Sequence, residues 1–164
     1  MKLRESTRRY ILLGMITFVI LGVFVAKVLA SGQDEQFAKE DLLYQQAMQL
    51  SINGDYQNAS IYINELLKTQ SDSEDANYLG GLIAANLGEI QQAAILLQKT
   101  IDLNPHRVED PMFMLQLGEM FYRAERYEDA KIVLTKCQEA GWAPEEMPNY
   151  QTKVAELLSS IENM

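Results

Sequence analysis

The chain has 164 residues and a formal net charge of −9, which allows one ordinary domain plus a short appendage. Residues 1–30 hold five basic residues and one acidic residue, whereas residues 31–164 hold 9 basic and 22 acidic residues. This acidic part lacks the clustered Lys and Arg that neutralise nucleic-acid phosphates, and an anionic membrane surface repels it. The single cysteine, Cys137, excludes an intrachain disulfide and a cysteine-ligated metal site.

An apolar segment follows a basic tail at the N-terminus. Residues 10–30 contain one charge, Lys27, and as a helix they would be about 31 Å long, the thickness of a bilayer core. The basic residues in 1–9 predict a cytoplasmic N-terminus. We therefore expect a single transmembrane anchor in a bacterial inner membrane, with the rest of the chain outside the cytoplasm.

A cleaved signal peptide is the alternative for this segment, because small residues end at Ala30 where a signal peptidase would cut. The apolar stretch of residues 10–26 is longer than the usual ~7–15 residues of a signal peptide, which favours the anchor. Both alternatives export the remainder. Residues 31–39 are polar and predict a short linker that holds the next domain near the bilayer.

A recurring hexamer organises the chain after residue 40. "GDYQNA" begins at Gly54, "GEIQQA" at Gly88 and "ERYEDA" at Glu125, so the spacing is first 34 and then 37 residues. Self-similarity on this scale is typical of a solenoid. The three extra residues fall within "NPHRVEDP", residues 104–111. The predicted repeats are residues 40–73, 74–107 and 111–144.

Each copy places a polar turn between two apolar stretches at helical spacing, which predicts a helical hairpin. Ser73 and Asp110 are expected N-caps, and Gly54 and Gly88 are expected to relieve a tight turn between helices, where Glu125 stands in the third copy. Residues 145–162 predict one further amphipathic helix that caps the stack, with its apolar face formed by Tyr150, Val154, Leu157, Leu158 and Ile161.

The sequence resembles the tetratricopeptide repeat family, whose pattern reads W-x2-L-G-x2-Y, then A-x3-F, then P. The third copy fits best, and the resemblance covers residues 38–144, although no tryptophan stands at the signature position. The matching residues are Met114, Leu117, Gly118, Phe121, Ala130 and Leu134 in the third copy, and Gly81, Ala84, Ala93, Leu97 and Pro105 in the second. The predicted fold is all-α, a solenoid of three such repeats and a capping helix behind one transmembrane helix.

The resemblance implies a concave face, formed by the first helix of each hairpin, that holds a peptide segment or a partner helix. The implied groove positions are Tyr44, Met48, Ile52, Tyr78, Leu82, Asn86, Leu115, Glu119, Tyr122 and Arg123. Two alternatives remain. These side chains pack within the stack instead, or the acidic convex side, including Glu128 and Asp129, binds a basic partner.

Nothing in the sequence points to catalysis, so we expect no enzyme activity, no cofactor and no metal. The single histidine, His106, stands in a linker without a second ligand at metal-binding spacing. Cys137 falls on the inward face of its predicted helix, where a thiol is unreactive.

The predicted function is a membrane-anchored scaffold that binds a protein partner outside the cytoplasm and assists assembly of a membrane or envelope complex. Its mechanism is positional, because holding two partners at one surface raises their effective concentration. The alternatives are a constitutive subunit of a multi-protein membrane complex and an import receptor that faces the cytosol. The residues leave the partner and the oligomeric state open.

Overall fold

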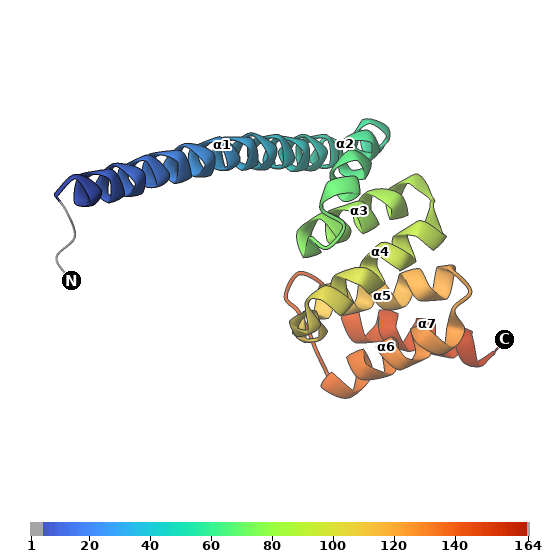
Figure 1. Cartoon of the computed structure of the whole chain (residues 1–164). Coiled ribbons are helices and arrows are strands. Elements are labelled where there is room, and N and C mark those ends of the chain that lie inside the picture. The colour runs from blue at the N-terminus through green and yellow to red at the C-terminus, as the bar shows by residue number, and fades with distance from the viewer. Residues whose placement is uncertain (1–4, 164) are drawn as a thin grey trace. The chain divides into compact units, whose positions relative to one another are not determined.

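The structure, a computed structural model, describes residues 5–163; within this range the side chains of residues 5–13, 26 and 28–34 lie outside the description. The described chain is helical, without strands (Figure 1). It divides into two compact units, Met1–Leu42 and Leu43–Met164. The helices are α1 (Glu5–Ile52), α2 (Tyr56–Thr69), α3 (Glu74–Leu87), α4 (Ile90–Leu103), the 3-10 helix η1 (Pro105–Glu109), α5 (Pro111–Arg123), α6 (Tyr127–Ala140) and α7 (Tyr150–Glu162).

The predicted linker of residues 31–39 is helical, because α1 continues through it without a break. The segment "SGQDEQFAK" holds one glycine and no proline, and its Gln, Glu, Ala and Lys are good helix formers. The boundary between the two compact units falls after Leu42, a few residues later than the predicted one.

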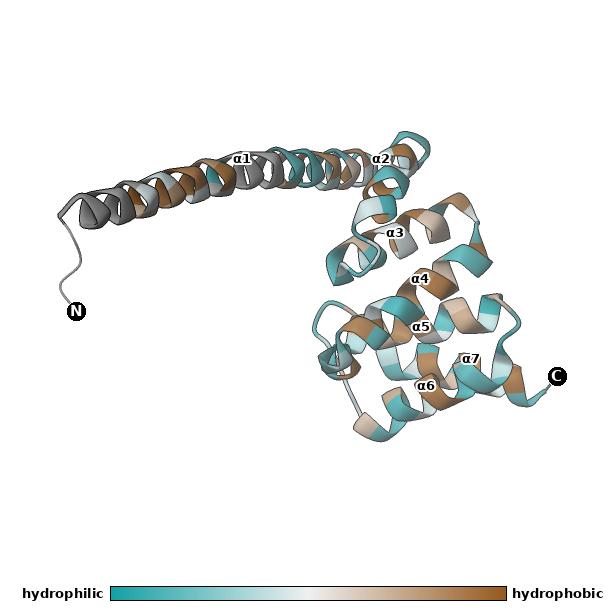
Figure 2. Ribbon diagram, in the orientation of Figure 1, coloured by the Kyte–Doolittle hydropathy of each residue, from teal (hydrophilic) through white to brown (hydrophobic). Residues whose placement is uncertain are grey.

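Residues 14–25 of α1 are exposed around the whole helix, and nearly all of them are apolar (Figure 2). Phe18 is 80 % exposed and Phe24 is 66 % exposed. In the described part of the chain, no helix is both long and apolar enough to cross a membrane. The predicted span of residues 10–30 includes side chains outside the description.

The second unit is a stack of three helical hairpins and a cap, as predicted. Residues 43–52 of α1 and α2 form the first hairpin, α3 and α4 the second, and α5 and α6 the third. Each helix from α2 to α7 packs on the next one, and α7 also packs on α5 (Figure 1). In the second repeat, predicted as residues 74–107, the second helix ends at Leu103 and the residues after it form η1.

Small residues let the two helices of a hairpin approach closely. A Cβ added at Gly81 would lie 2.8 Å from Leu97 Cδ2, and one added at Gly118 would lie 2.7 Å from Leu134 Cδ2. Ala47 occupies the same repeat position in the first hairpin and is fully buried. The predicted inward position of Cys137 is confirmed, since its side chain is 0 % exposed.

Candidate functional site

The predicted groove positions all lie on the first helices of the hairpins, in α1, α3 and α5. The structure separates them into three groups by exposure. Four are exposed, five are half-buried and one, Leu115, is buried. The exposed residues are Met48, Ile52, Asn86 and Arg123, and the half-buried ones are Tyr44, Tyr78, Leu82, Glu119 and Tyr122.

Ile52 and Met48 are the most exposed apolar side chains of this set. Ile52 is 72 % exposed and Met48 is 41 % exposed, and they lie one helical turn apart on α1. Half-buried Leu82 occupies the repeat position of Met48 on α3. Large apolar side chains on a helix that faces solvent mark a surface that a partner can cover.

Leu115 does not contribute to this surface. Its side chain is 4 % exposed and belongs to the main hydrophobic cluster of the domain, together with residues of α6 and α7. The sequence could not separate it from its equivalents Tyr44 and Tyr78, because the third hairpin alone is followed by a cap. Leu115 is therefore a core residue.

Tyr78 also packs within the stack. Its hydroxyl lies 3.2 Å from Gln116 Oε1, and its ring centroid lies 5.8 Å from that of Phe113, so both groups bind α3 to α5. Tyr122 packs its ring at 5.9 Å against Tyr127 in an edge-on arrangement. The alternative in which groove tyrosines stabilise the stack thus applies to Tyr78, and in part to Tyr122.

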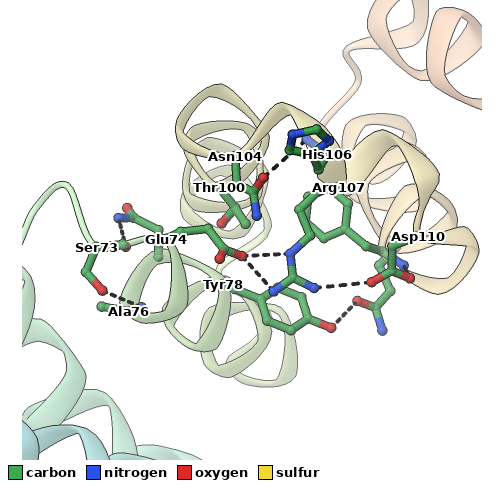
Figure 3. Close-up of polar contacts among 12 residues, drawn as sticks. Ser73, Glu74, Ala76, Tyr78, Thr100, Asn104, His106, Arg107 and Asp110 are labelled. Atoms are coloured by element: carbon green, nitrogen blue, oxygen red, sulfur yellow. Dashed lines mark hydrogen bonds and ion pairs between the residues drawn. The ribbon is translucent and has the colours of Figure 1, made fainter.

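A charged cluster that the sequence did not indicate lies beside Tyr78 (Figure 3). Arg107 in η1 donates from Nε to Glu74 Oε1 at 2.7 Å, and its Nη1 donates to Asp110 Oδ2 at 3.2 Å. The guanidinium carbon also lies 4.8 Å from the ring centroid of Tyr78 and 5.7 Å from that of Phe113. One side chain therefore joins α3, η1 and the start of α5.

The repeat spacing held a clue to this cluster. Glu74 and Arg107 are 33 residues apart, close to one repeat, so the start of α3 and the linker after α4 lie at the same end of neighbouring hairpins. Asp110 has a second role, because its Oδ1 accepts a hydrogen bond from the Phe113 backbone N–H at 3.0 Å, as its predicted N-cap position requires. Ser73 likewise caps α3 by accepting from Ala76 N–H.

The tyrosines near this cluster are neutral donors at physiological pH. Burial raises the pKa of Tyr44, and the charges of Asp75 and Glu74 raise it further. Burial also raises the pKa of Tyr78, and so does the charge of Asp110, while Arg107 acts in the opposite direction. Burial of the Arg107 guanidinium opposes its charge, but hydrogen bonds to Glu74 and Asp110 outweigh that effect and raise its pKa. The Arg107 guanidinium therefore stays charged.

The structure gives the remaining candidates structural roles. Burial raises the pKa of the Cys137 thiol, and the buried side chain of Tyr150 lies beside it. His106 is exposed on η1, where its backbone N–H donates to Asn104 Oδ1. Among the residues that the structure describes, no group of three or more His, Cys, Asp or Glu side chains is placed to hold a metal ion.

Known proteins match this chain through structure alone. No protein-family model matches it, and no curated protein matches its sequence. The chain is similar to SycD, the type III secretion translocator chaperone of Yersinia enterocolitica, with a TM-score of 0.59 and 18 % identity over 75 % of this chain and 83 % of that chain. SycD in complex with a peptide of the translocator YopD gives a TM-score of 0.58 and 18 % identity over 75 % and 92 %.

A third similar structure is an O-GlcNAc transferase of Thermobaculum terrenum, with a TM-score of 0.52 and 22 % identity over 62 % of this chain and 19 % of that chain. Identities this low show the fold alone. The expectation of a protein that is not an enzyme is consistent with the chaperone that two of these structures contain. The second unit is accordingly a tetratricopeptide-like stack of helical hairpins.

Proposed function

We propose that the first-helix face of the stack binds an apolar segment of another protein, and that the chain holds this partner beside a membrane. The observation that carries the binding role is the exposure of Ile52 and Met48 on α1, at positions that line the binding face in the repeat family the chain resembles. Half-buried Leu82 and Tyr44 lie at further positions of the predicted groove.

The partner segment is expected to be apolar and free of acidic residues. Methionine adapts its shape to different side chains, and tyrosine offers rigid area with a hydroxyl at its tip. Asp75 and Glu74 lie close enough to Tyr44 to act on its pKa, so a carboxylate on the partner would be repelled there. The likeness to a chaperone that has been seen with a bound peptide supports a peptide segment as the ligand.

The exposed apolar residues of α1 support the membrane anchor. A helix that is apolar on all sides is typical of a protein core or a membrane span, and residues 14–25 of α1 are exposed and nearly all apolar. The basic residues at the start of the chain support an N-terminus in the cytoplasm and a stack outside it, as in a bacterial inner-membrane protein. In this arrangement the partner is concentrated at the bilayer.

Cross-linking in intact membranes tests the binding face. A photo-reactive amino acid is placed at Ile52, at Met48 and, as a control, at Glu156, which is exposed on α7. We expect one protein to be captured from Ile52 and Met48 and not from Glu156. Tyr78 is a poor position for this experiment because its hydroxyl and ring already contact α5.

Binding by the captured segment is then measured directly. A synthetic peptide of the cross-linked segment is titrated into the full chain and into Ile52→Asp, which places a charge on the exposed apolar surface without disturbing the core. We expect the dissociation constant of the peptide to rise at least about tenfold in the variant, since an unpaired carboxylate opposes an apolar contact. Equal binding by both chains, or equal capture from Glu156, would reject the first-helix face as the site.

A further inference from the structure

The second helices of the three hairpins each expose one isoleucine at the same repeat position. Ile61 on α2 is 65 % exposed, Ile95 on α4 is 54 % exposed and Ile132 on α6 is 70 % exposed. The spacings of 34 and 37 residues are those of the repeat itself. We call these three residues the isoleucine row.

The fold does not require isoleucine at these positions. The inward residues of the same helices, such as Ile63, Leu97 and Leu134, are at most 1 % exposed and fill the core. An exposed β-branched side chain is less favourable in a helix than Ala, Gln or Lys, and it leaves apolar surface in water. Three such side chains in register are better explained by a surface that another molecule covers.

Shallow hollows flank the row. Ile95 lines one of them together with Asn64 of α2 and Gln92 of α4. Ile132 lines another together with Thr135 and Lys136 of α6. The face thus offers exposed apolar side chains next to shallow hollows.

The charge of this face differs from that of the rest of the domain. Residues 40–164 contain 8 basic and 20 acidic residues, so most surfaces of the domain repel a second copy. Helices α2, α4 and α6 carry four lysines and five carboxylates, and are close to neutral. Two copies therefore repel each other less through this face than through the rest of the domain surface.

We propose that the isoleucine row is a self-association surface and that its occupant is the same row of a second copy of this chain. A two-fold symmetric contact places the same surface on both sides. Helix α4 is the middle one of the three second helices. A two-fold axis that lies in the contact plane and passes through the centre of the row therefore pairs α4 with its own copy. Ile95 then lies next to Ile95 of the second copy.

The contact is small, which sets the expected affinity. Three side chains and their neighbours cover less than the ~800 Å² per partner of a standard interface, so we expect dimerisation with a dissociation constant in the micromolar range or weaker. This surface lies on the second helices, whereas the proposed partner-binding residues lie on the first helices. The two proposals can therefore fail separately.

Sedimentation of the full chain in a non-ionic detergent tests the proposal. The wild type is compared with the triple variant Ile61→Gln, Ile95→Gln and Ile132→Gln, in which exposed residues are exchanged for a good helix former. The matched control is Ile52→Gln, an equally exposed isoleucine of the first-helix face. We expect the dissociation constant of the dimer to rise at least about tenfold in the triple variant and to stay unchanged in the control. Association through the N-terminal helix is common to all three chains and cancels.

A cysteine at the centre of the row gives a second measurement. Mild oxidation should join two copies of Ile95→Cys through a disulfide, while Ile52→Cys stays uncoupled; buried Cys137 is present in both chains. Equal dimerisation of the wild type and the triple variant, or coupling from position 52 alone, would overturn the proposal. It is also overturned if the wild type stays monomeric while the triple variant alone loses binding to lipid vesicles or to another protein, since the row would then have a different occupant.

Discussion

Three equivalent turn residues adopt a left-handed backbone between the two helices of a hairpin. Gly54 has φ of 78°, Gly88 has φ of 79°, and Glu125 in the third hairpin has φ of 60°. Only glycine adopts this conformation without a steric penalty from Cβ. The predicted role of the two glycines is confirmed, and Glu125 occupies the same turn at a cost.

Replacing this glutamate should stabilise the protein. We expect Glu125→Gly to raise the free energy of unfolding by about 0.5–1 kcal/mol, because the relief of backbone strain exceeds the added chain entropy of glycine. Urea unfolding followed by circular dichroism measures the change. Gly88→Ala introduces a Cβ at the equivalent turn position and should lower the free energy of unfolding by about 1 kcal/mol. A loss of stability in Glu125→Gly would show that the glutamate side chain outweighs its backbone strain.

The close approach at Gly118 yields a second prediction at this scale. A Cβ there would lie 2.7 Å from Cδ2 and 2.8 Å from Cγ of Leu134, which is fully buried. We expect Gly118→Ala to destabilise the fold by about 1–3 kcal/mol in spite of the higher helix propensity of alanine. Thermal unfolding measures it.

Gly80→Ala is the matched control for this prediction. A Cβ at Gly80 would lie 3.2 Å from Leu96 Cδ1 and 3.3 Å from Leu67 Cδ1, the far ends of flexible side chains. Its effect should be clearly smaller than that of Gly118→Ala. The opposite order would mean that helix propensity, and not packing, decides these positions.

At the scale of the elements, η1 and its Arg107 hold neighbouring hairpins together. The side chains of Arg107 and Glu74 are 23 % and 24 % exposed, so their ion pair lies between an exposed pair and a buried one. We expect Arg107→Met to lower the free energy of unfolding by about 1–2 kcal/mol, because it leaves two carboxylates without their partner. A double-mutant cycle with Glu74→Gln in urea unfolding isolates the pair. Additive single effects would show that the ring contacts of Arg107 matter more than its charge.

The cap helix α7 is fixed to the third hairpin through Tyr150. Its hydroxyl donates to the Pro111 carbonyl at 2.8 Å, and its side chain is 0 % exposed. We expect Tyr150→Phe to cost about 1–2 kcal/mol, since the carbonyl loses its hydrogen bond while the ring packing is kept. Hydrogen exchange should show faster exchange in α7 and α5 and little change in α3. A uniform change along the chain would contradict this local role.

At the scale of the whole molecule, the anchor proposal predicts how the chain partitions. Phe18→Arg together with Phe24→Arg places two charges among the exposed apolar residues of α1, and each charge costs about 2.5–3.5 kcal/mol within a bilayer. We expect the wild type to stay with membranes after alkaline carbonate extraction and the variant to be released. Gln57→Arg with Gln138→Arg is the control, because it adds the same charge to exposed positions of the stack. Release of the wild type would reject the anchor.

The sequence by itself determined the hairpins, their order and their caps. Helical spacing, the N-caps Ser73 and Asp110 and the turn glycines are local features, and a backbone within a few residues responds to them directly. The predicted linker of residues 31–39 is part of α1, because most of its polar residues are good helix formers. The groove was predicted from a repeat pattern, which assigns equivalent positions the same role.

Only the tertiary structure decided which of those equivalent positions are free. Tyr44, Tyr78 and Leu115 occupy one repeat position, yet Tyr78 binds α5 and Leu115 is buried in the core. The same holds for Arg107, which reaches Glu74 a repeat away. Whether a side chain is covered depends on the hairpin that follows it and on the cap that ends the stack. These contacts join residues far apart in the chain, so no local pattern could specify them.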